Sequence, residues 1–195
     1  MIRNRLSWPM NTLEKIILIG MKSSGKSTTG KVLARKLGRC FIDMDDRIER
    51  MHWEQKGEKL CFREIFGKHG KDYFRTLETA VLRALANSPE DAPSVLATGG
   101  GLPLAEENRT LLGRLGVMVF LDVQQEVLLS RILMGGIPAF FPYPDDPARS
   151  LAEILEVRRP IYRALAHLVV ECRAEAPETI ADKIIKLLEI HPHED

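Results

Sequence analysis

The stretch from residue 15 to residue 37 has the spacing of a phosphate-binding loop between a strand and a helix. An apolar run, KIILI, is followed by Gly20. After four further residues come Gly25, Lys26 and Ser27. In such a loop the backbone N–H groups turn toward one centre, where the following helix also directs its positive dipole end. A lysine here reaches the β- and γ-phosphates, and the next hydroxyl binds Mg²⁺. We therefore expect the nucleotide-binding residues to be Gly20, Met21, Lys22, Ser23, Ser24, Gly25, Lys26, Ser27 and Thr28.

Apolar runs alternate with segments of helical periodicity along the chain. The apolar runs are at residues 15–20, 40–45, 94–101, 116–123 and 167–172, of which 40–45 is the weakest. The helical patterns are at residues 26–37, 73–86, 106–115, 124–133, 148–165 and 177–190. Runs that are apolar on both alternations are typical of strands buried on both faces of a parallel sheet. The alternation predicts an α/β fold with helices on both faces of that sheet.

The composition argues against several other classes of protein. The formal net charge of +1 lacks the strong basic bias of proteins that bind nucleic acids or membrane surfaces. No run of 18 apolar residues could span a membrane, and no apolar stretch follows the basic N-terminal residues as in a secretory signal. Cys40, Cys61 and Cys172 are widely spaced and lack metal-type pairing, so we expect reduced, mostly buried thiols in a cytoplasmic protein.

The length of 195 residues suits one domain, which we place at residues 14–195 after an N-terminal extension at residues 1–13. The only low-complexity feature is GGIPAFFPYPDDPARS, which has four prolines between Pro138 and Pro147. Proline at this density excludes a helix and a central strand. A long irregular loop in a compact domain is a functional lid or a disordered segment, and we interpret residues 134–150 as a lid.

Three further features have the residue types of an acceptor site. Asp43 and Asp45 lie two apart in a strand pattern, so both carboxylates can face the phosphates, one near Mg²⁺ and one accepting a hydroxyl proton. Glycines 99–101 end another strand and suit a close approach of backbone to a ligand. Arg75 and Glu78 have helical spacing, which can aim a guanidinium at a carboxylate. Taken singly, these features also fit a solvated acidic turn, a flexible connection and a surface ion pair.

The order of these motifs resembles the shikimate kinase family over residues 14–190. The motifs are GMKSSGKST, FIDMD, YFRTLE, ATGGG, VFLDV and RRPIY, with an arginine at position 131. The resemblance implies a P-loop NTPase fold of the nucleoside-monophosphate-kinase type, with a five-stranded parallel sheet and a mobile lid. It also implies transfer of the γ-phosphoryl group of ATP to the 3-hydroxyl of shikimate, with Mg²⁺, in the route to chorismate and aromatic amino acids. Members of the family are typically monomers.

The resemblance also implies roles for single residues. Lys26, Asp45 and Arg75 are the expected catalytic residues, and Asp45 also holds the hydroxyls of shikimate. Ser27 and Asp43 are expected at the metal. The remaining roles are nucleotide binding by Arg131, a grip on the shikimate carboxylate by Arg75 and Arg158, and backbone contacts to the ring from Gly99, Gly100 and Gly101. The substrate-binding region is expected at about residues 45–80.

Two regions depart from the family pattern. In the lid, Ile137 replaces an arginine that stabilises the transferring phosphate, and we predict that Arg149 or Arg131 supplies the missing charge. Residues 51–62 are also longer and more polar than expected. Two alternatives therefore stay open: a P-loop kinase for another small hydroxy acid or sugar acid, and a nucleotide-binding paralogue with weak catalysis. The residues assigned to the acceptor favour a ring that carries a carboxylate and hydroxyls.

Overall fold

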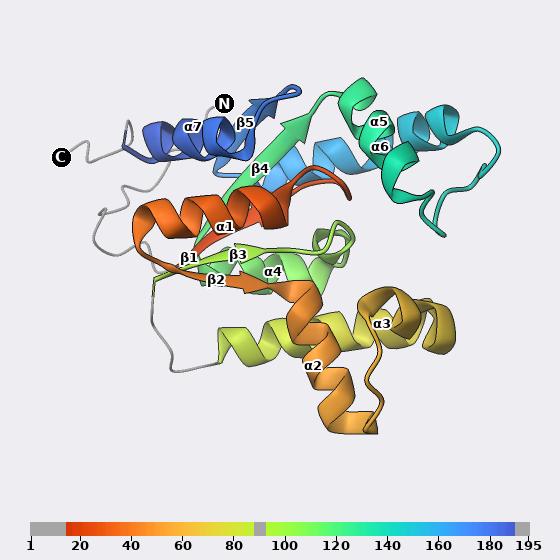
Figure 1. The fold of residues 1–195 in the computed structure, drawn as a ribbon. Coiled ribbons are helices and arrows are strands. Elements are labelled where there is room, and N and C mark those ends of the chain that lie inside the picture. The colour runs from red at the N-terminus through yellow and green to blue at the C-terminus, as the bar shows by residue number, and fades with distance from the viewer. Residues whose placement is uncertain (1–14, 88–92, 190–195) are drawn as a thin grey trace.

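The computed structural model describes residues 15–87 and 93–189, which fold around a parallel sheet (Figure 1). The strands are β1 (Lys15–Ile19), β2 (Cys40–Asp43), β3 (Ser94–Ala97), β4 (Val117–Val123) and β5 (Leu168–Cys172). They form one five-stranded sheet in the order β2-β3-β1-β4-β5, and every pairing is parallel. The predicted α/β fold is confirmed. The N-terminal extension at residues 1–13 lies outside the described residues.

Helices cover both faces of this sheet. They are α1 (Lys26–Leu37), α2 (Met44–Lys56), α3 (Phe62–Ala86), α4 (Glu106–Leu115), α5 (Gln125–Gly135), α6 (Pro147–Leu165) and α7 (Pro177–Glu189), with a 3-10 turn, η2 (Leu102–Leu104). α1 and α7 lie side by side, whereas α3 and α4 pack together (Figure 1). Among the described residues, no helix combines the length and apolar character needed to cross a membrane.

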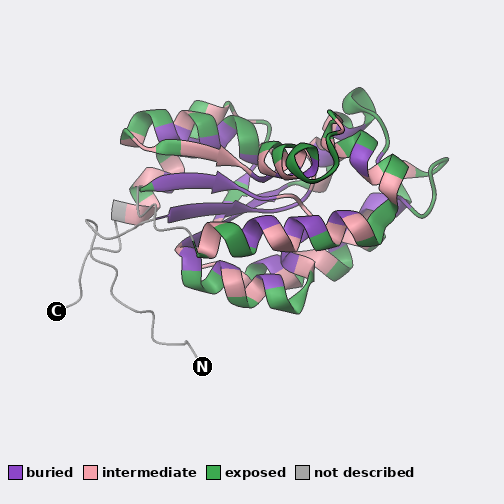
Figure 2. Cartoon of the chain, turned by 90° about the horizontal axis from the view of Figure 1, so that it is seen from below, coloured by how far each residue is buried: buried purple, intermediate pink, exposed green. Residues whose placement is uncertain are grey.

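The central strand β1 is buried on both faces because its side chains alternate between two hydrophobic layers. Ile16 and Leu18 pack in the layer that contains apolar residues of α1 and α7. Ile17 and Ile19 pack in the layer that contains apolar residues of α2, α3 and α4. Figure 2 shows the buried strands enclosed by helices whose outer faces are exposed. Continuous apolar strands are therefore the pattern expected for this sheet, and the loop after β1 has a rigid base.

The second strand is shorter than predicted because a helix begins at Met44. The Asp43 carboxylate accepts a hydrogen bond from the Asp45 backbone N–H (3.1 Å) and thereby caps the N-terminus of α2. The strand predicted at residues 40–45 thus ends at Asp43. The expectation that Asp43 and Asp45 share one face of a strand is wrong, since Asp45 lies in the first turn of the helix.

Helix α3 begins well before the predicted segment 73–86 and contains a bend. The Glu64 side chain accepts a hydrogen bond from the Cys61 N–H (2.8 Å), which closes a capping box at the start of α3. Gly70 has φ 82° and ψ 173°, so the helix is interrupted there. The interruption breaks the helical periodicity, and the pattern of the sequence therefore reports the second half of α3 alone.

The irregular part of the lid is shorter than residues 134–150, because α5 ends at Gly135 and α6 begins at Pro147. Proline at the first helical position needs no partner for the N–H that it lacks, so Pro147 starts a helix here. Phe141 is buried in the core. The Tyr143 N–H donates to Ser150 Oγ (2.9 Å), and this hydroxyl donates to the Tyr143 carbonyl (2.8 Å). The lid is thus anchored in its middle and at the start of α6.

The cysteines differ from the expectation in their burial. Cys172 is buried in the core, but Cys40 and Cys61 are exposed, so the prediction of mostly buried thiols is wrong. Cys40 begins the edge strand β2, and Cys61 precedes α3. All three cysteines are free, as predicted.

Candidate active site

The loop between β1 and α1 has a backbone that favours glycine at both ends. Gly20 has φ 145° and Gly25 has φ 89°. A Cβ at Gly20 would lie 2.9 Å from the Leu121 carbonyl oxygen. Ser23 also has a positive φ of 65°, which is uncommon for residues other than glycine. Left-handed residues between right-handed ones turn successive N–H groups toward one concave side, which is the geometry of an anion-binding loop.

The Lys26 side chain is folded into this loop. Its Nζ donates hydrogen bonds to the carbonyls of Gly20 (3.0 Å) and Met21 (2.8 Å) and to Ser24 Oγ (3.3 Å). Burial lowers the Lys26 pKa to about 8, and the negative charges of Asp45 and Asp43 oppose this shift. The ammonium is therefore still the main form at neutral pH, and it lies on the concave side of the loop as a phosphate partner must.

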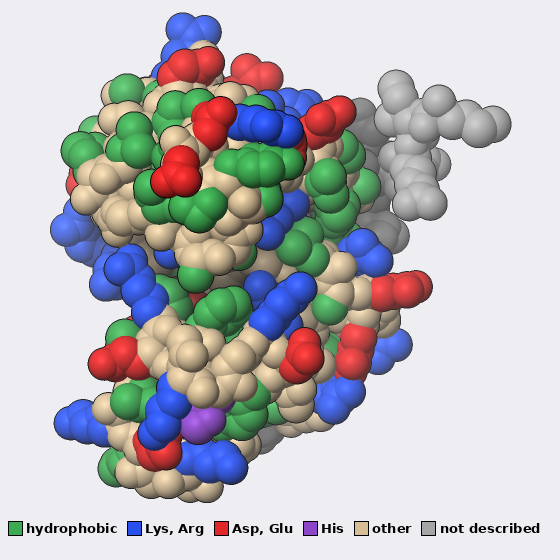
Figure 3. Space-filling model, turned by 90° about the vertical axis from the view of Figure 1, so that its right-hand side faces the viewer, with side chains coloured by type: hydrophobic (Ala, Val, Ile, Leu, Met, Phe, Trp, Pro, Cys, Tyr) green, Lys and Arg blue, Asp and Glu red, His purple; other side chains and the backbone are tan. Residues whose placement is uncertain are grey.

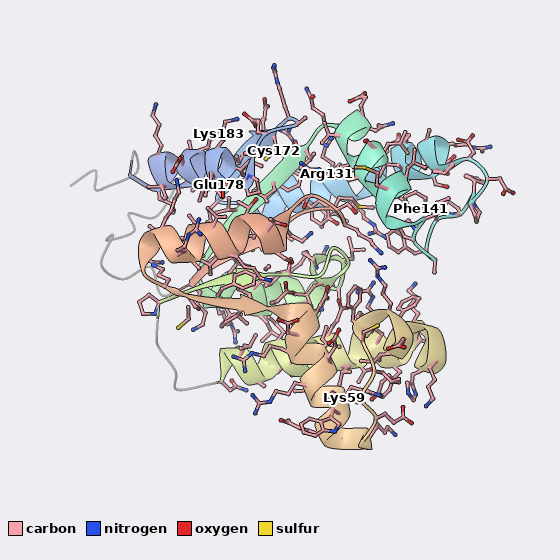
Figure 4. All side chains as sticks on the ribbon, in the orientation of Figure 1. Lys59, Arg131, Phe141, Cys172, Glu178 and Lys183 are labelled. Carbon is pink, nitrogen blue, oxygen red and sulfur yellow. The ribbon has the colours of Figure 1, made fainter. Side chains whose placement is uncertain are left out.

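A pocket of about 360 Å³ adjoins the outer side of the loop. Its lining residues are Ser23, Ser24, Gly25, Thr28, Thr29, Arg131, Glu175, Pro177 and Ile180. Arg131 extends from α5 to the loop, where its Nη1 donates to the Ser23 carbonyl (3.3 Å; Figure 4). Of the residues predicted to bind the nucleotide, Ser23, Ser24, Gly25, Thr28 and Arg131 line this pocket. Sequence reasoning missed Thr29, Glu175, Pro177 and Ile180, although the carboxyl ends of parallel strands share one edge and β5 ends there.

The two aspartates at the start of α2 interact electrostatically with Lys26, since their negative charges oppose the lowering of its pKa by burial. Burial raises the Asp45 pKa to about 6, the Asp43 charge adds to the shift, and the Lys26 charge opposes it. Asp43 is tied to the backbone of α2 as its cap. The structure thus brings both predicted carboxylates to the phosphate loop, but through a helix cap and not through a shared strand face.

Gly99 and Gly100 follow β3 and let the phosphate loop approach the acceptor groups. A Cβ at Gly100 would lie 2.9 Å from the Lys22 backbone nitrogen. A Cβ at Gly99 would lie 2.9 Å from Glu78 Oε1 and 3.8 Å from Asp45 Oδ1. A side chain at Gly99 would crowd the Glu78 and Asp45 carboxylates, and one at Gly100 would press on the backbone of the loop. These glycines lie close to protein groups, and the approach of their backbone to a ligand stays a prediction.

The third glycine makes room for an arginine. A Cβ at Gly101 would overlap the guanidinium of Arg75, which projects from the second half of α3. Arg75 forms an ion pair with Glu78 one helical turn later. The Glu78 side chain is buried, and burial raises its pKa against the opposing charge of Arg75. A buried carboxylate thus orients one side of the guanidinium, which is one-third exposed, so its other nitrogens remain available to a ligand.

Arg158 approaches the same cleft from α6. Its Nη1 lies 3.9 Å from the Met21 sulfur, and its guanidinium lies over the Phe140 ring of the lid at 4.9 Å. Next to it, the buried Tyr162 hydroxyl donates to the Gly100 carbonyl (2.6 Å). Burial raises the Tyr162 pKa, and the Arg158 charge opposes this. Tyr162 and Phe140 were missed from the sequence, although Tyr162 belongs to the RRPIY motif. Figure 3 shows a hollow on this side of the molecule, with basic side chains around it.

The two arginines considered for the missing lid charge differ in their surroundings. Arg149 is exposed, donates from Nε to Glu153 (3.0 Å) and from Nη2 to the Tyr143 hydroxyl (3.4 Å), and stacks over the Tyr143 ring at 4.1 Å. Arg131 contacts the phosphate loop directly. In this conformation, Arg131 is the arginine of the two that touches the loop, and Arg149 is engaged by lid and α6 groups.

The family model and the similar proteins all indicate the same family. The family model described as shikimate kinase matches residues 22–189. A shikimate kinase from Acinetobacter baumannii (strain AYE) is 36% identical over 177 residues, which cover 91% of this chain and 93% of the relative. A shikimate kinase from Parasynechococcus marenigrum (strain WH8102) is 38% identical over 173 residues, or 89% of this chain and 85% of the relative.

The solved structures agree with the sequence comparison. The structure of shikimate kinase from Acinetobacter baumannii in complex with shikimate matches with a TM-score of 0.80 at 36% identity, covering 92% of this chain and 94% of that one. The structure from Aquifex aeolicus vf5 matches with a TM-score of 0.70 at 34% identity, covering 90% and 96%. The family model and these relatives each match most of the chain. The chain belongs to the shikimate kinase family.

Proposed function

We propose that this chain transfers the γ-phosphoryl group of ATP to the 3-hydroxyl of shikimate, in the route to chorismate and aromatic amino acids. The observation that carries the proposal is the arrangement around residues 99–101, where Asp45 and the Arg75 guanidinium meet the phosphate loop. Shikimate presents a carboxylate and ring hydroxyls, which are the groups that an arginine and an aspartate bind.

In this reaction Asp45 orients the acceptor hydroxyl and takes up its proton. A general base is most effective when its pKa lies near the working pH. The Asp45 pKa of about 6 leaves the carboxylate ionised at neutral pH while keeping it more basic than an exposed aspartate. Burial, which causes the shift, also excludes competing water from the hydroxyl.

Arg75 and Arg158 bind the shikimate carboxylate from two elements, α3 and α6. Guanidinium groups form paired hydrogen bonds to a carboxylate, which fix its direction as well as its position. The Glu78 carboxylate, buried beneath Arg75, keeps that guanidinium pointed into the cleft. Positioning the carboxylate in this way sets the ring hydroxyls relative to Asp45 and to the nucleotide.

Mg²⁺ fits the oxygen donors at the start of α1 and α2. The exposed Ser27 hydroxyl follows Lys26. The negative charge of the Asp43 carboxylate acts on Lys26 and partly offsets the lowering of its pKa by burial. Hydroxyl and carboxylate oxygens are the ligands that Mg²⁺ accepts, usually together with phosphate oxygens and water. When bound, Mg²⁺ neutralises charge on the β- and γ-phosphates. Lys26 and Arg131 supply the positive charges that the chain itself places at the loop.

A coupled assay of ADP release with shikimate and a panel of small hydroxy acids and sugar acids tests the substrate. We expect shikimate to give the highest kcat/KM. Analogues that lack the carboxylate should be poor acceptors. A higher kcat/KM with another acid would support the first alternative, and acceptor-independent ATP binding without turnover would support the second.

We also propose a cytoplasmic monomer without nucleic-acid or membrane partners, in line with the net charge of +1. Size-exclusion chromatography with light scattering would test the monomer.

A further inference from the structure

A second cluster of metal-ligating side chains lies away from the nucleotide site, where α2 packs on the first half of α3. His52 comes from α2, Glu58 from the connection after it, and His69 from α3 just before the bend at Gly70. Each side chain offers one ligand atom, and these atoms lie within 4.8 Å of one another. We propose that His52, Glu58 and His69 bind a divalent transition-metal ion, with Zn²⁺ as the representative ion, and that this ion ties α2 to α3.

The separations of the donor atoms suit a common metal ion. His69 Nε2 lies 3.0 Å and His52 Nε2 lies 3.4 Å from the same atom, Glu58 Oε2. Zn²⁺ binds imidazole nitrogen and carboxylate oxygen at about 2.0–2.2 Å, which places tetrahedral ligands roughly 3.4 Å from one another. Two imidazoles and a carboxylate suit Zn²⁺ and related late transition metals better than Mg²⁺ or Ca²⁺. The set leaves further positions for water.

His52 supplies an independent sign that a ligand belongs here. Its side chain is fully buried, and within the described part of the chain its Nε2 atom has no hydrogen-bond partner. A buried polar atom without a partner is uncommon in native proteins and often marks an unseen water or ion. This nitrogen faces Glu58 and thus the centre of the cluster.

Tyr73 orients His52 in the manner of a supporting residue at a metal site. Its hydroxyl lies 2.8 Å from His52 Nδ1, so this hydrogen bond can keep the proton on Nδ1 and leave the Nε2 lone pair for a metal. The rings of His52, His69 and Tyr73 also pack together, with centroids 4.9 to 5.7 Å apart. The imidazoles are therefore held in place before a metal binds.

Lys68 carries a positive charge beside the cluster, close to where a metal ion would bind. Its Nζ lies 2.9 Å from Glu58 Oε1, which leaves Oε2 turned toward the two imidazoles. The Lys68 side chain is 56% exposed, so it can move into solvent when a second positive charge arrives.

The ion would act on the shape of the acceptor region and not on phosphoryl transfer itself. α2 carries Asp45 in its first turn, and α3 carries Arg75 beyond the bend at Gly70. A metal between His52 and His69 would fix the packing of these helices on the near side of the bend. Figure 1 shows α2 and α3 in the lower part of the view, whereas α5 and α7 lie in the upper part. Two of the three ligands, His52 and Glu58, lie in the polar segment at residues 51–62, and the third, His69, lies in α3.

Titration of the chelator-treated full-length protein with Zn²⁺ alone, by calorimetry and by thermal denaturation, tests the proposal. We expect one saturable site with micromolar or tighter affinity and a Tm that rises with Zn²⁺. His69→Gln and Glu58→Gln replace partly exposed ligands and should abolish both effects. Tyr73→Phe should weaken binding by about tenfold to a hundredfold, as loss of a supporting hydrogen bond does. Co²⁺ should give visible absorption typical of a low-coordinate site.

The control is the double variant His191→Ala/His193→Ala, because a His–Pro–His sequence near the C-terminus can itself bind Zn²⁺. This variant should keep the saturable site and the rise in Tm. Loss of binding in the control variant, with unchanged binding in His69→Gln and Glu58→Gln, would overturn the proposal. So would a Tm of the parent protein that does not respond to Zn²⁺, which would make the cluster a hydrogen-bonded network only.

Discussion

Replacing Gly101 by alanine should remove the grip on the acceptor carboxylate without unfolding the protein. Gly101 has φ −91° and ψ −13°, a conformation that alanine adopts without strain. The added Cβ would overlap the Arg75 guanidinium, which is the end of a flexible side chain and can swing away. The cost therefore falls on the position of Arg75 and not on the backbone.

The size of the effect follows from the hydrogen bonds that Arg75 would lose. Charge-assisted hydrogen bonds contribute about 1.5–3 kcal/mol, which corresponds to about a tenfold to a hundredfold loss in kcat/KM for shikimate. The ATP KM should stay within about twofold, because the residues that we propose for the nucleotide, Lys26 and Arg131, contact the phosphate loop and not Arg75. Steady-state kinetics with shikimate varied at saturating ATP, and thermal denaturation of the same samples, measure both.

Gly113→Ala is the matched control, because a Cβ at Gly113 in α4 meets nothing within 4 Å. This control should keep normal kinetics and a Tm equal to or slightly above that of the parent. If Gly101→Ala leaves the shikimate KM unchanged, Arg75 does not bind the acceptor. If both KM values rise together with a fall in Tm, the substitution has damaged the fold, and Arg75→Lys, which keeps the charge but not the paired hydrogen bonds, becomes the deciding variant.

Four other substitutions test separate parts of the site. Lys26→Ala should lower kcat by roughly two to three orders of magnitude at an unchanged fold, and near-normal turnover would remove Lys26 from phosphoryl transfer. Asp45→Asn should be nearly inactive with an unchanged ATP affinity, whereas the parent kcat/KM should fall as the pH drops through about 6 and Asp45 is protonated. Because the folded-state pKa of Asp45 is raised, its ionisation destabilises the native state at neutral pH. Asp45→Asn should therefore be more stable than the parent by about 1–2 kcal/mol at pH 7. In denaturant titrations this difference in stability should disappear below about pH 4. If the lid closes and brings Arg149 to the phosphate, Arg149→Ala should lower kcat at least tenfold, and adding Ile137→Arg in a double variant should restore part of that loss. An unchanged kcat in Arg149→Ala would leave Arg131 as the source of the charge.

Much of the fold was accessible from local patterns. The phosphate loop could be predicted because strand, turn and helix are adjacent in the chain and each has its own signature. The long helix α6 was also predicted almost to its ends, although Pro160 lies inside it. The whole of α2 was missed. At its start, FIDMD has the apolar alternation of a strand, and the capping role of Asp43 outweighs that pattern.

The parts that sequence reasoning missed depend on contacts between distant segments. The first half of α3 is separated from the predicted second half by Gly70, where the helix is interrupted. Glu175 and Pro177 line the nucleotide pocket only because β5 ends at the same edge of the sheet as β1. Tyr162 lies 62 positions from Gly100, its hydrogen-bond partner, so no local pattern could report that contact.

The most direct measurement is identification of the product formed from ATP and shikimate, by ³¹P and ¹H NMR of the reaction mixture. We expect one new phosphate ester on the 3-oxygen of shikimate, formed in equal amount to ADP and absent when Lys26→Ala replaces the parent protein. ADP released without a phosphorylated acid, or a phosphoryl group on another oxygen, would contradict the proposed reaction.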